Sequence, residues 1–248
     1  MNQVAAFPVQ RPSLALLGAE PFRAAMEFAW HRLDNAEHTK PGDGHPVVIF
    51  PGLGGDGHSV ATLREHCRSL GYDAFDWGQG FNTGPRGDLD VWLHTLKAQI
   101  VDLLAGHTQP ATLIGWSLGG LYAREVGKLM APQIRQVITI ATPFNAEADR
   151  SNVGWLLRLL SGTSSTMDAT LRQRLRTPPP LRTTSIYSRS DGIVAWQTCR
   201  HDERSRLVED IEIEGSHIGM GWNRDVLAAV ADRLDQPPGQ WRRYGGAQ

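Results

Sequence analysis

The sequence predicts an α/β protein: a mostly parallel sheet with helices on both faces. Three observations carry this prediction. Short apolar runs alternate with amphipathic stretches, Gly- and Pro-containing segments separate them, and two of the runs lead into glycine-rich turns. The 248 residues are 41% hydrophobic, which is enough for one sizeable core. We therefore expect one domain over residues 1–248.

Each element is predicted from its own apolar pattern. The expected strands are short apolar runs flanked by turn residues, at 47–50, 72–77, 111–116, 137–141, 183–187 and 207–213. The expected core helices carry one apolar face each, at 59–70, 89–105, 118–130 and 223–234. Ser59 is in place to cap the first of these helices.

An additional helix is predicted over residues 13–34, with Pro21 as an interruption. Its apolar side chains at helical spacing are Leu14, Leu17, Met26, Trp30 and Leu33. This spacing favours a helix that packs on the core, and a helix that docks on a membrane surface is the alternative.

The block 145–180 departs from the alternation. It has no strand pattern, contains two short amphipathic stretches and ends in three consecutive prolines at 178–180. We expect a helical insertion between two core strands. Long insertions in compact domains are mostly functional, so a lid is favoured over a long crossover connection.

Composition restricts the function classes. A net charge of −1 argues against nucleic-acid binding. Cys67 and Cys199 are too few for a disulfide framework or a cysteine-based zinc site, so we expect two free thiols and no metal. The N-terminus lacks the pattern of a secretory signal, and no apolar run is long enough for a membrane span. The expected location is cytoplasmic.

The first glycine-rich turn lies in V-V-I-F-P-G-L-G-G-D-G-H-S, residues 47–59. Its glycines at 52, 54 and 57 match the dinucleotide fingerprint G-x-G-x-x-G. Asp76 follows about twenty residues on, where that fingerprint asks for an acidic residue. Nicotinamide or flavin binding is therefore one interpretation, and it leaves the motifs below unexplained.

The second turn, G-W-S-L-G at 115–119, matches G-x-S-x-G between a predicted strand and a predicted helix. Such a tight turn strains the serine, and side chains at the flanking positions would clash, so glycine is needed there. Ser117 is thus a candidate nucleophile. A nucleophilic serine needs a base and an acid that orients the base, in the chain order Ser, acid, His.

The base and the acid should each follow a late strand. His217 does so, whereas His201, the second candidate, lies in a polar run typical of solvated surface. Asp191 also follows a strand, and Gly192 after it permits a tight turn. The remaining acid candidates lie in the insertion or in the charged run: Asp149, Asp168 and Asp202.

At this point the chain resembles the α/β-hydrolase family, in its bacterial lipase and esterase branch. The matching pieces, from about residue 46 to 234, are P-G-L-G-G, G-W-S-L-G-G, A-T-P-F, S-D-G-I-V and G-S-H. The resemblance implies the α/β-hydrolase fold, no cofactor, and an oxyanion hole made by the backbone N–H groups of Leu53 and Leu118. Pro51 stands where many members have histidine, and Ala141 where many have glycine.

The expected reaction is cleavage of a carboxylic ester through an acyl-enzyme on Ser117. The substrate is expected to be a small-molecule or lipid-like ester of a small to medium apolar acid. The apolar residues of the insertion are compatible with an acyl chain: Val153, Trp155, Leu156, Leu159 and Leu160. A thioesterase, an acyltransferase, a polyester depolymerase and a non-catalytic ligand-binding member of the fold remain alternatives.

Overall fold

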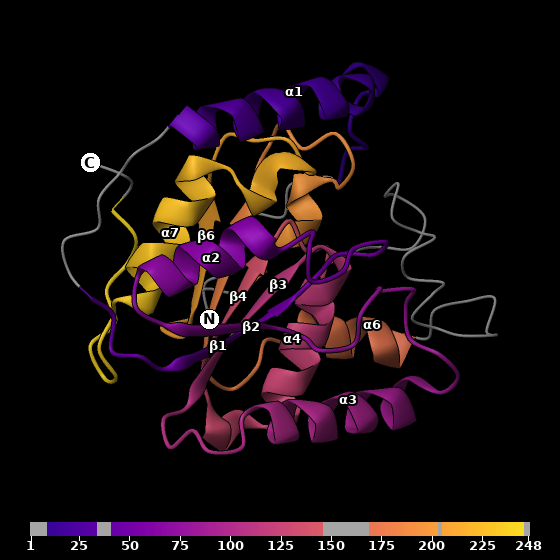
Figure 1. Cartoon of the computed structure of the whole chain (residues 1–248). Helices are drawn as coiled ribbons and strands as arrows, with labels where there is room; N and C mark the ends of the chain where they lie inside the picture. The colour runs from indigo at the N-terminus through magenta and orange to yellow at the C-terminus, as the bar shows by residue number, and fades with distance from the viewer. Residues whose placement is uncertain (1–8, 34–40, 146–168, 203–204, 246–248) are drawn as a thin grey trace.

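A six-stranded sheet forms the centre of the molecule (Figure 1). The computed structural model describes residues 9–33, 41–145, 169–202 and 205–245. Every neighbouring pair of strands is parallel, in the spatial order β2-β1-β3-β4-β5-β6, so the carboxyl ends of all six meet at one edge. The predicted parallel sheet is confirmed. The strands are β1 (Pro46–Phe50), β2 (Asp73–Asp76), β3 (Ala111–Trp116), β4 (Ile134–Ile140), β5 (Arg182–Tyr187) and β6 (Val208–Glu212).

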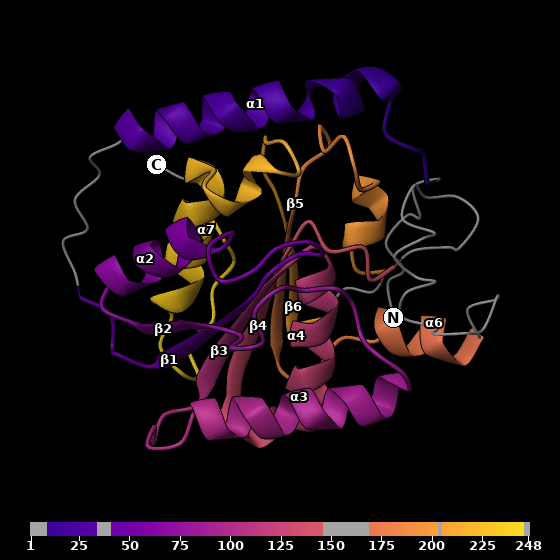
Figure 2. The ribbon, with the colours of Figure 1, turned by 45° about the vertical axis from the view of Figure 1, so that its right-hand side comes forward.

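Helices cover both faces of the sheet (Figures 1 and 2). On one face, α2 and α7 pack on a core that includes Val47 and Ile49 of β1. On the other, α3 and α4 pack on a core that includes Val48 and Phe50 of the same strand. Alternate side chains of one buried strand thus supply two cores, which explains its unbroken apolar run. The four helices are α2 (Ala61–Ser69), α3 (Leu89–Leu103), α4 (Leu118–Leu129) and α7 (Arg224–Leu234).

Most element boundaries lie within two residues of the predicted ones, because turn and cap residues define them locally. The side chains of Asp88 and Asn223 accept hydrogen bonds from the first backbone N–H groups of α3 and α7. The predicted cap at Ser59 is wrong. Helix α2 begins at Ala61 after Val60, and the Ser59 hydroxyl donates instead to the carbonyl of Asp56, 2.7 Å away.

Helix α1 (Leu14–Leu33) does not pack as expected. Pro21 lies inside it without ending it, and its only buried residues are Glu20 and Ala24. The apolar residues assigned to the core are exposed, with relative exposures of 84% for Leu14, 42% for Leu17, 45% for Met26, 64% for Trp30 and 74% for Leu33. Helix α1 crosses the carboxyl edge of the sheet rather than one of its faces, so it meets polar loops there (Figures 1 and 2).

The predicted insertion is described only at its two ends. Residues 146–168 lie outside the described residues, so a lid remains a prediction. The last part of the block forms α6 (Ala169–Arg176), which lies against α4. There Leu175 joins the core, and Arg174 pairs with the buried carboxylate of Glu125 at 2.6 Å.

Candidate active site

Ser117 occupies the turn between β3 and α4. Its backbone has φ 52° and ψ −119°, a strained conformation for a residue with a side chain. The turn is held by the Ser117 N–H, which donates to the Ile140 carbonyl of β4 at 2.8 Å. A Cβ at Gly119 would collide with the carbonyls of Phe50 and Pro51, so glycine lets α4 approach β1 closely. The local fold therefore presents the Ser117 hydroxyl at the carboxyl edge of the sheet.

Two loops bring an imidazole and a carboxylate to this hydroxyl. His217 Nε2 lies 3.2 Å from Ser117 Oγ, and His217 Nδ1 lies 2.7 Å from Asp191 Oδ2. The loop after β5 carries Asp191 and the loop after β6 carries His217. The three residues singled out in the sequence are thus joined in one chain of hydrogen-bonding atoms, in the arrangement that activates a serine.

Local hydrogen bonds fix the orientation of the Asp191 carboxylate. Its Oδ1 accepts from the backbone N–H groups of Ile193 and Val194, at 2.8 and 2.7 Å, which leaves Oδ2 for the imidazole. Gly192 does not use the positive φ that glycine adopts more easily than other residues. A Cβ at Gly192 would lie 2.6 Å from the carbonyl of Leu16, so this glycine is required by the passage of α1.

The imidazole of His217 is buried beside negative charge. Burial disfavours the charged imidazolium, but the carboxylate of Asp191 and the nearby Glu20 stabilise it, and the pKa of His217 is raised above its ordinary value. Both carboxylates are also buried, so little water screens them. The site thus favours an imidazole that takes up a proton from the serine.

Sequence reasoning did not identify Glu20, whose side chain reaches both loops. It accepts hydrogen bonds from the backbone N–H groups of Gly192 and His217. A signal was present, because Glu20, Arg23 and Glu27 lie at spacings of three and four on one helical face. The apolar residues at helical spacing indicated the opposite face of this helix, which is the face exposed to solvent.

His201 is not on the solvated surface, which corrects the expectation drawn from its polar neighbours. It is 7% exposed and its Nδ1 lies 2.6 Å from Asp210 Oδ1. Its Nε2 accepts a hydrogen bond from Arg124 at 3.0 Å. Burial and the guanidinium of Arg124 lower the pKa of His201 against the effect of Asp210. This second Asp–His pair therefore has an arginine where the first has a serine.

The loop after β1 carries the expected oxyanion donor Leu53. The N–H groups that follow are used within the structure, since Gly54 donates to the Asn82 carbonyl at 2.8 Å and Gly55 to the Gly52 carbonyl at 3.1 Å. The N–H of Leu118 opens α4, where an amide has no partner within its own helix. These amides follow neighbouring strands β1 and β3, but their joint action on an oxyanion remains a prediction.

Asn82, a second residue that sequence reasoning missed, holds this loop. It is fully buried, and its side-chain Nδ2 donates to the Pro51 carbonyl at 2.8 Å. Its Oδ1 accepts from the backbone N–H of Gly84 at 3.1 Å. No sequence signal marked it, because an asparagine in a glycine-rich loop is ordinary turn chemistry.

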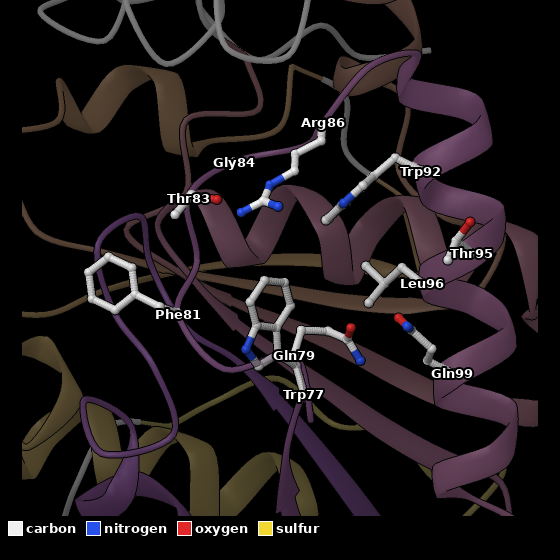
Figure 3. Close-up of a pocket in the computed structure, with 10 residues that line it drawn as sticks. All are labelled: Trp77, Gln79, Phe81, Thr83, Gly84, Arg86, Trp92, Thr95, Leu96 and Gln99. Carbon is white, nitrogen blue, oxygen red and sulfur yellow. The ribbon is translucent and has the colours of Figure 1, made fainter.

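A cavity of about 260 Å³ lies between the segment around Asn82 and helix α3 (Figure 3). None of Ser117, Asp191 and His217 lines it. Apolar and polar side chains alternate around it: the apolar ones are Trp77, Phe81, Trp92 and Leu96, and the polar ones include Gln79, Arg86, Thr95 and Gln99. The cavity is thus bounded by the segment that holds the loop after β1.

Asp76 has a structural partner. Its Oδ2 lies 2.8 Å from Arg64 Nη1, and a Cβ at Gly57 would lie 2.5 Å from the same oxygen. Gly57 therefore makes room for this ion pair. The acidic residue of the dinucleotide fingerprint is explained without a ribose.

The chain has a parallel sheet and a strained serine in the turn between β3 and α4. These two features are typical of α/β proteins that present a nucleophile at the carboxyl edge of the sheet. The family model described as "Alpha/beta hydrolase family" matches residues 47–245, and the chain belongs to that family. This confirms the resemblance seen in the sequence. Ala141, where many members have glycine, adopts a φ of 48°, which explains the preference.

Comparison with individual proteins adds detail. The chain is 31% identical over 127 residues to a pimeloyl-[acyl-carrier protein] methyl ester esterase of Shewanella woodyi, a match covering 50% of this chain and 47% of that protein. Bacillus licheniformis lipase BlEst2 superposes with a TM-score of 0.59 at 17% identity, covering 82% of this chain and 96% of that one. Paleococcus ferrophilus monoacylglycerol lipase gives 0.57 at 14%, covering 80% and 96%. The structural likeness at these identities concerns the fold.

Proposed function

We propose that the protein is a serine hydrolase that cleaves carboxylic esters through an acyl-enzyme. The observation that carries the proposal is the chain of contacts from Ser117 Oγ to His217 and from His217 to Asp191. Family membership supports the reaction class, and the name of the methyl ester esterase relative supports an ester bond as the target.

In the proposed mechanism, His217 Nε2 takes the proton of Ser117 as its oxygen attacks the ester carbonyl. Asp191 keeps the other proton on Nδ1 and stabilises the imidazolium. The amides of Leu53 and Leu118 bind the oxyanion, each contributing about 10²- to 10³-fold in rate. His217 then protonates the leaving alcohol, and water releases the acid by the same steps.

A small or medium apolar acyl group is the proposed substrate class. The most direct test is a series of p-nitrophenyl esters from acetate to palmitate, with Ser117→Ala as the blank. We expect turnover that is highest for short to medium chains and absent in the blank. Full esterase activity of the Ser117→Ala protein would refute the role of this serine.

Three further measurements separate the alternatives. A fluorophosphonate probe should label the unchanged protein at Ser117, with the adduct located by peptide mass spectrometry. A non-catalytic ligand-binding protein would label slowly or not at all. Offering water, alcohols and thiols to the trapped acyl-enzyme distinguishes a hydrolase from an acyltransferase, and thioester substrates test for a thioesterase.

A further inference from the structure

Helix α1 is docked through its charged face rather than its apolar one. Glu20 is 1% exposed, whereas the large apolar residues Leu14, Phe22 and Trp30 are between 64% and 84% exposed. Burial of a carboxylate is costly unless hydrogen bonds compensate it. A helix that buries a carboxylate and exposes its apolar residues is therefore held by specific polar contacts.

Those contacts join the two loops of the candidate triad. Glu20 Oε1 accepts from the N–H of Gly192 at 2.7 Å and from the N–H of His217 at 3.0 Å. Its Oε2 accepts from the N–H of Ile218 at 3.0 Å. One carboxylate thus binds the residue after Asp191 and the backbone of His217 itself.

We propose that Glu20 is a positioning residue of the esterase site, which joins the Asp191 loop to the His217 loop and places a second negative charge beside the imidazole. The inference rests on the proposed function in that Ser117, Asp191 and His217 do the chemistry. Glu20 itself touches no reacting atom and acts through His217.

The neighbouring side chains of α1 support the same role. Arg23 Nη2 donates to Ser190 Oγ at 2.8 Å, next to Asp191 in the chain. Glu27 Oε1 accepts from the N–H of Ser216 at 2.7 Å, next to His217. From one and two turns after Glu20, α1 therefore holds each loop a second time. The helix lies outside residues 47–245, which the family model matches.

The charges around His217 come from three segments. Asp191 faces it from the loop after β5, and Glu20 faces its backbone from α1. Arg23 lies 4.0 Å from Glu20 and is shared with Ser190, while Glu214, in the segment after β6, accepts from the Ser190 hydroxyl. Both carboxylates nearest the ring stabilise the imidazolium, which explains the direction of the pKa shift of His217.

The test is an NMR titration of the His217 imidazole in the unchanged protein and in Glu20→Gln. The glutamine keeps the length of the side chain and one acceptor oxygen but removes the charge. Less negative charge destabilises the imidazolium, so the titration midpoint should move to lower pH. This readout needs no substrate, so it stands even if the protein proves not to cleave esters.

Glu27→Gln is the matched control. It removes the same charge about two helical turns after Glu20, and it also removes a contact to the His217 loop. We expect a smaller shift of the midpoint than in Glu20→Gln. Equal shifts in the two variants, or no shift in Glu20→Gln, would overturn the proposal.

Glu20→Asp separates charge from reach. The aspartate keeps the charge but withdraws the carboxylate from the two loops. Fluorophosphonate labelling of Ser117 should therefore slow by about 10-fold or more, because the base is misplaced. The titration midpoint of His217 should stay near that of the unchanged protein. Unchanged labelling in a folded Glu20→Asp protein would refute the positioning role, and this holds even if Glu20→Gln fails to fold.

Discussion

Nε2 of His201 lies 3.0 Å from Nη1 of Arg124, and both side chains are buried. His201 pairs with Asp210 much as His217 pairs with Asp191, at 2.6 and 2.7 Å. The partner of the outer nitrogen differs. A guanidinium donates to His201, so that nitrogen has no lone pair free to accept a proton from a serine. Two similar Asp–His pairs in one chain therefore have different partners at the outer nitrogen, a guanidinium in one and a serine hydroxyl in the other.

The first prediction compares these two histidines. Replacing His217 by alanine should reduce kcat on the order of 10⁴- to 10⁶-fold, because Ser117 loses its base. Replacing His201 by alanine should leave kcat/KM close to its original value but destabilise the fold by about 1–3 kcal/mol, because Arg124 loses a buried acceptor. The rate of ester hydrolysis per mole of folded protein and the thermal unfolding midpoint measure the two effects. The reverse pattern would show that His201 is the base.

The second prediction concerns pH. His217 must be unprotonated to accept the proton of Ser117, and its pKa is raised above the ordinary value of about 6.5. Activity should therefore be lost as the pH falls through a midpoint above about 6.5 in the profile of kcat/KM. Rates should be compared in buffers in which the protein stays folded. A midpoint clearly below 6.5, in the range of about 4 that is typical of a carboxylate, would contradict the role of His217.

The third prediction uses two glycines of the site. A Cβ at Gly52 would lie 3.4 Å from Ser117 Cβ, an ordinary contact, and 3.5 Å from the carbonyl of Trp116. Gly52→Ala should therefore fold with little loss of stability but hydrolyse esters more slowly, because the methyl group crowds the nucleophile. Gly119→Ala should unfold more easily, by about 1–3 kcal/mol or more, because rigid carbonyls block its Cβ. Thermal melts with esterase assays distinguish the two, and a marked loss of stability in Gly52→Ala would refute this account.

The fourth prediction concerns Asn82. Removing its side chain frees the Pro51 carbonyl, so the loop that carries Leu53 loses a fixed point. In Asn82→Ala we expect kcat to fall by about 10-fold, which is less than the 10² to 10³ of a lost oxyanion donor. The fold should lose about 1–3 kcal/mol, because a buried acceptor is left unpaired.

Gln99→Ala is the control for Asn82, since Gln99 is an amide side chain of α3 that lines the cavity beside the Asn82 segment. Its kcat should stay close to that of the unchanged protein. If kcat of Asn82→Ala also stays unchanged, Asn82 does not position the loop.

Local patterns were sufficient for much of the fold and of the candidate site. The strand 111–116 was predicted with its observed bounds, because a short, mostly apolar run leads there into the G-x-S-x-G turn. The elbow at Ser117 was recognisable because a strained turn demands glycine at fixed neighbouring positions. Asp191 and His217 could be chosen because parallel strands bring their carboxyl ends to one edge, so residues after late strands must converge.

Contacts between distant segments could not be predicted in this way. The burial of His201 depends on Arg124, which is 77 positions away in the chain, and no local pattern around it encodes that partner.

The sequence by itself therefore determined the order of the elements, the nucleophile turn and the chain order of its partners, because each depends on local periodicity or on sheet topology. Only the tertiary structure decided which side of α1 is buried. The hydrogen bond between Glu20 and the His217 N–H joins residues 197 positions apart. It forms only because two loops meet at the polar face of α1, whereas the apolar residues of α1 lie on the exposed face.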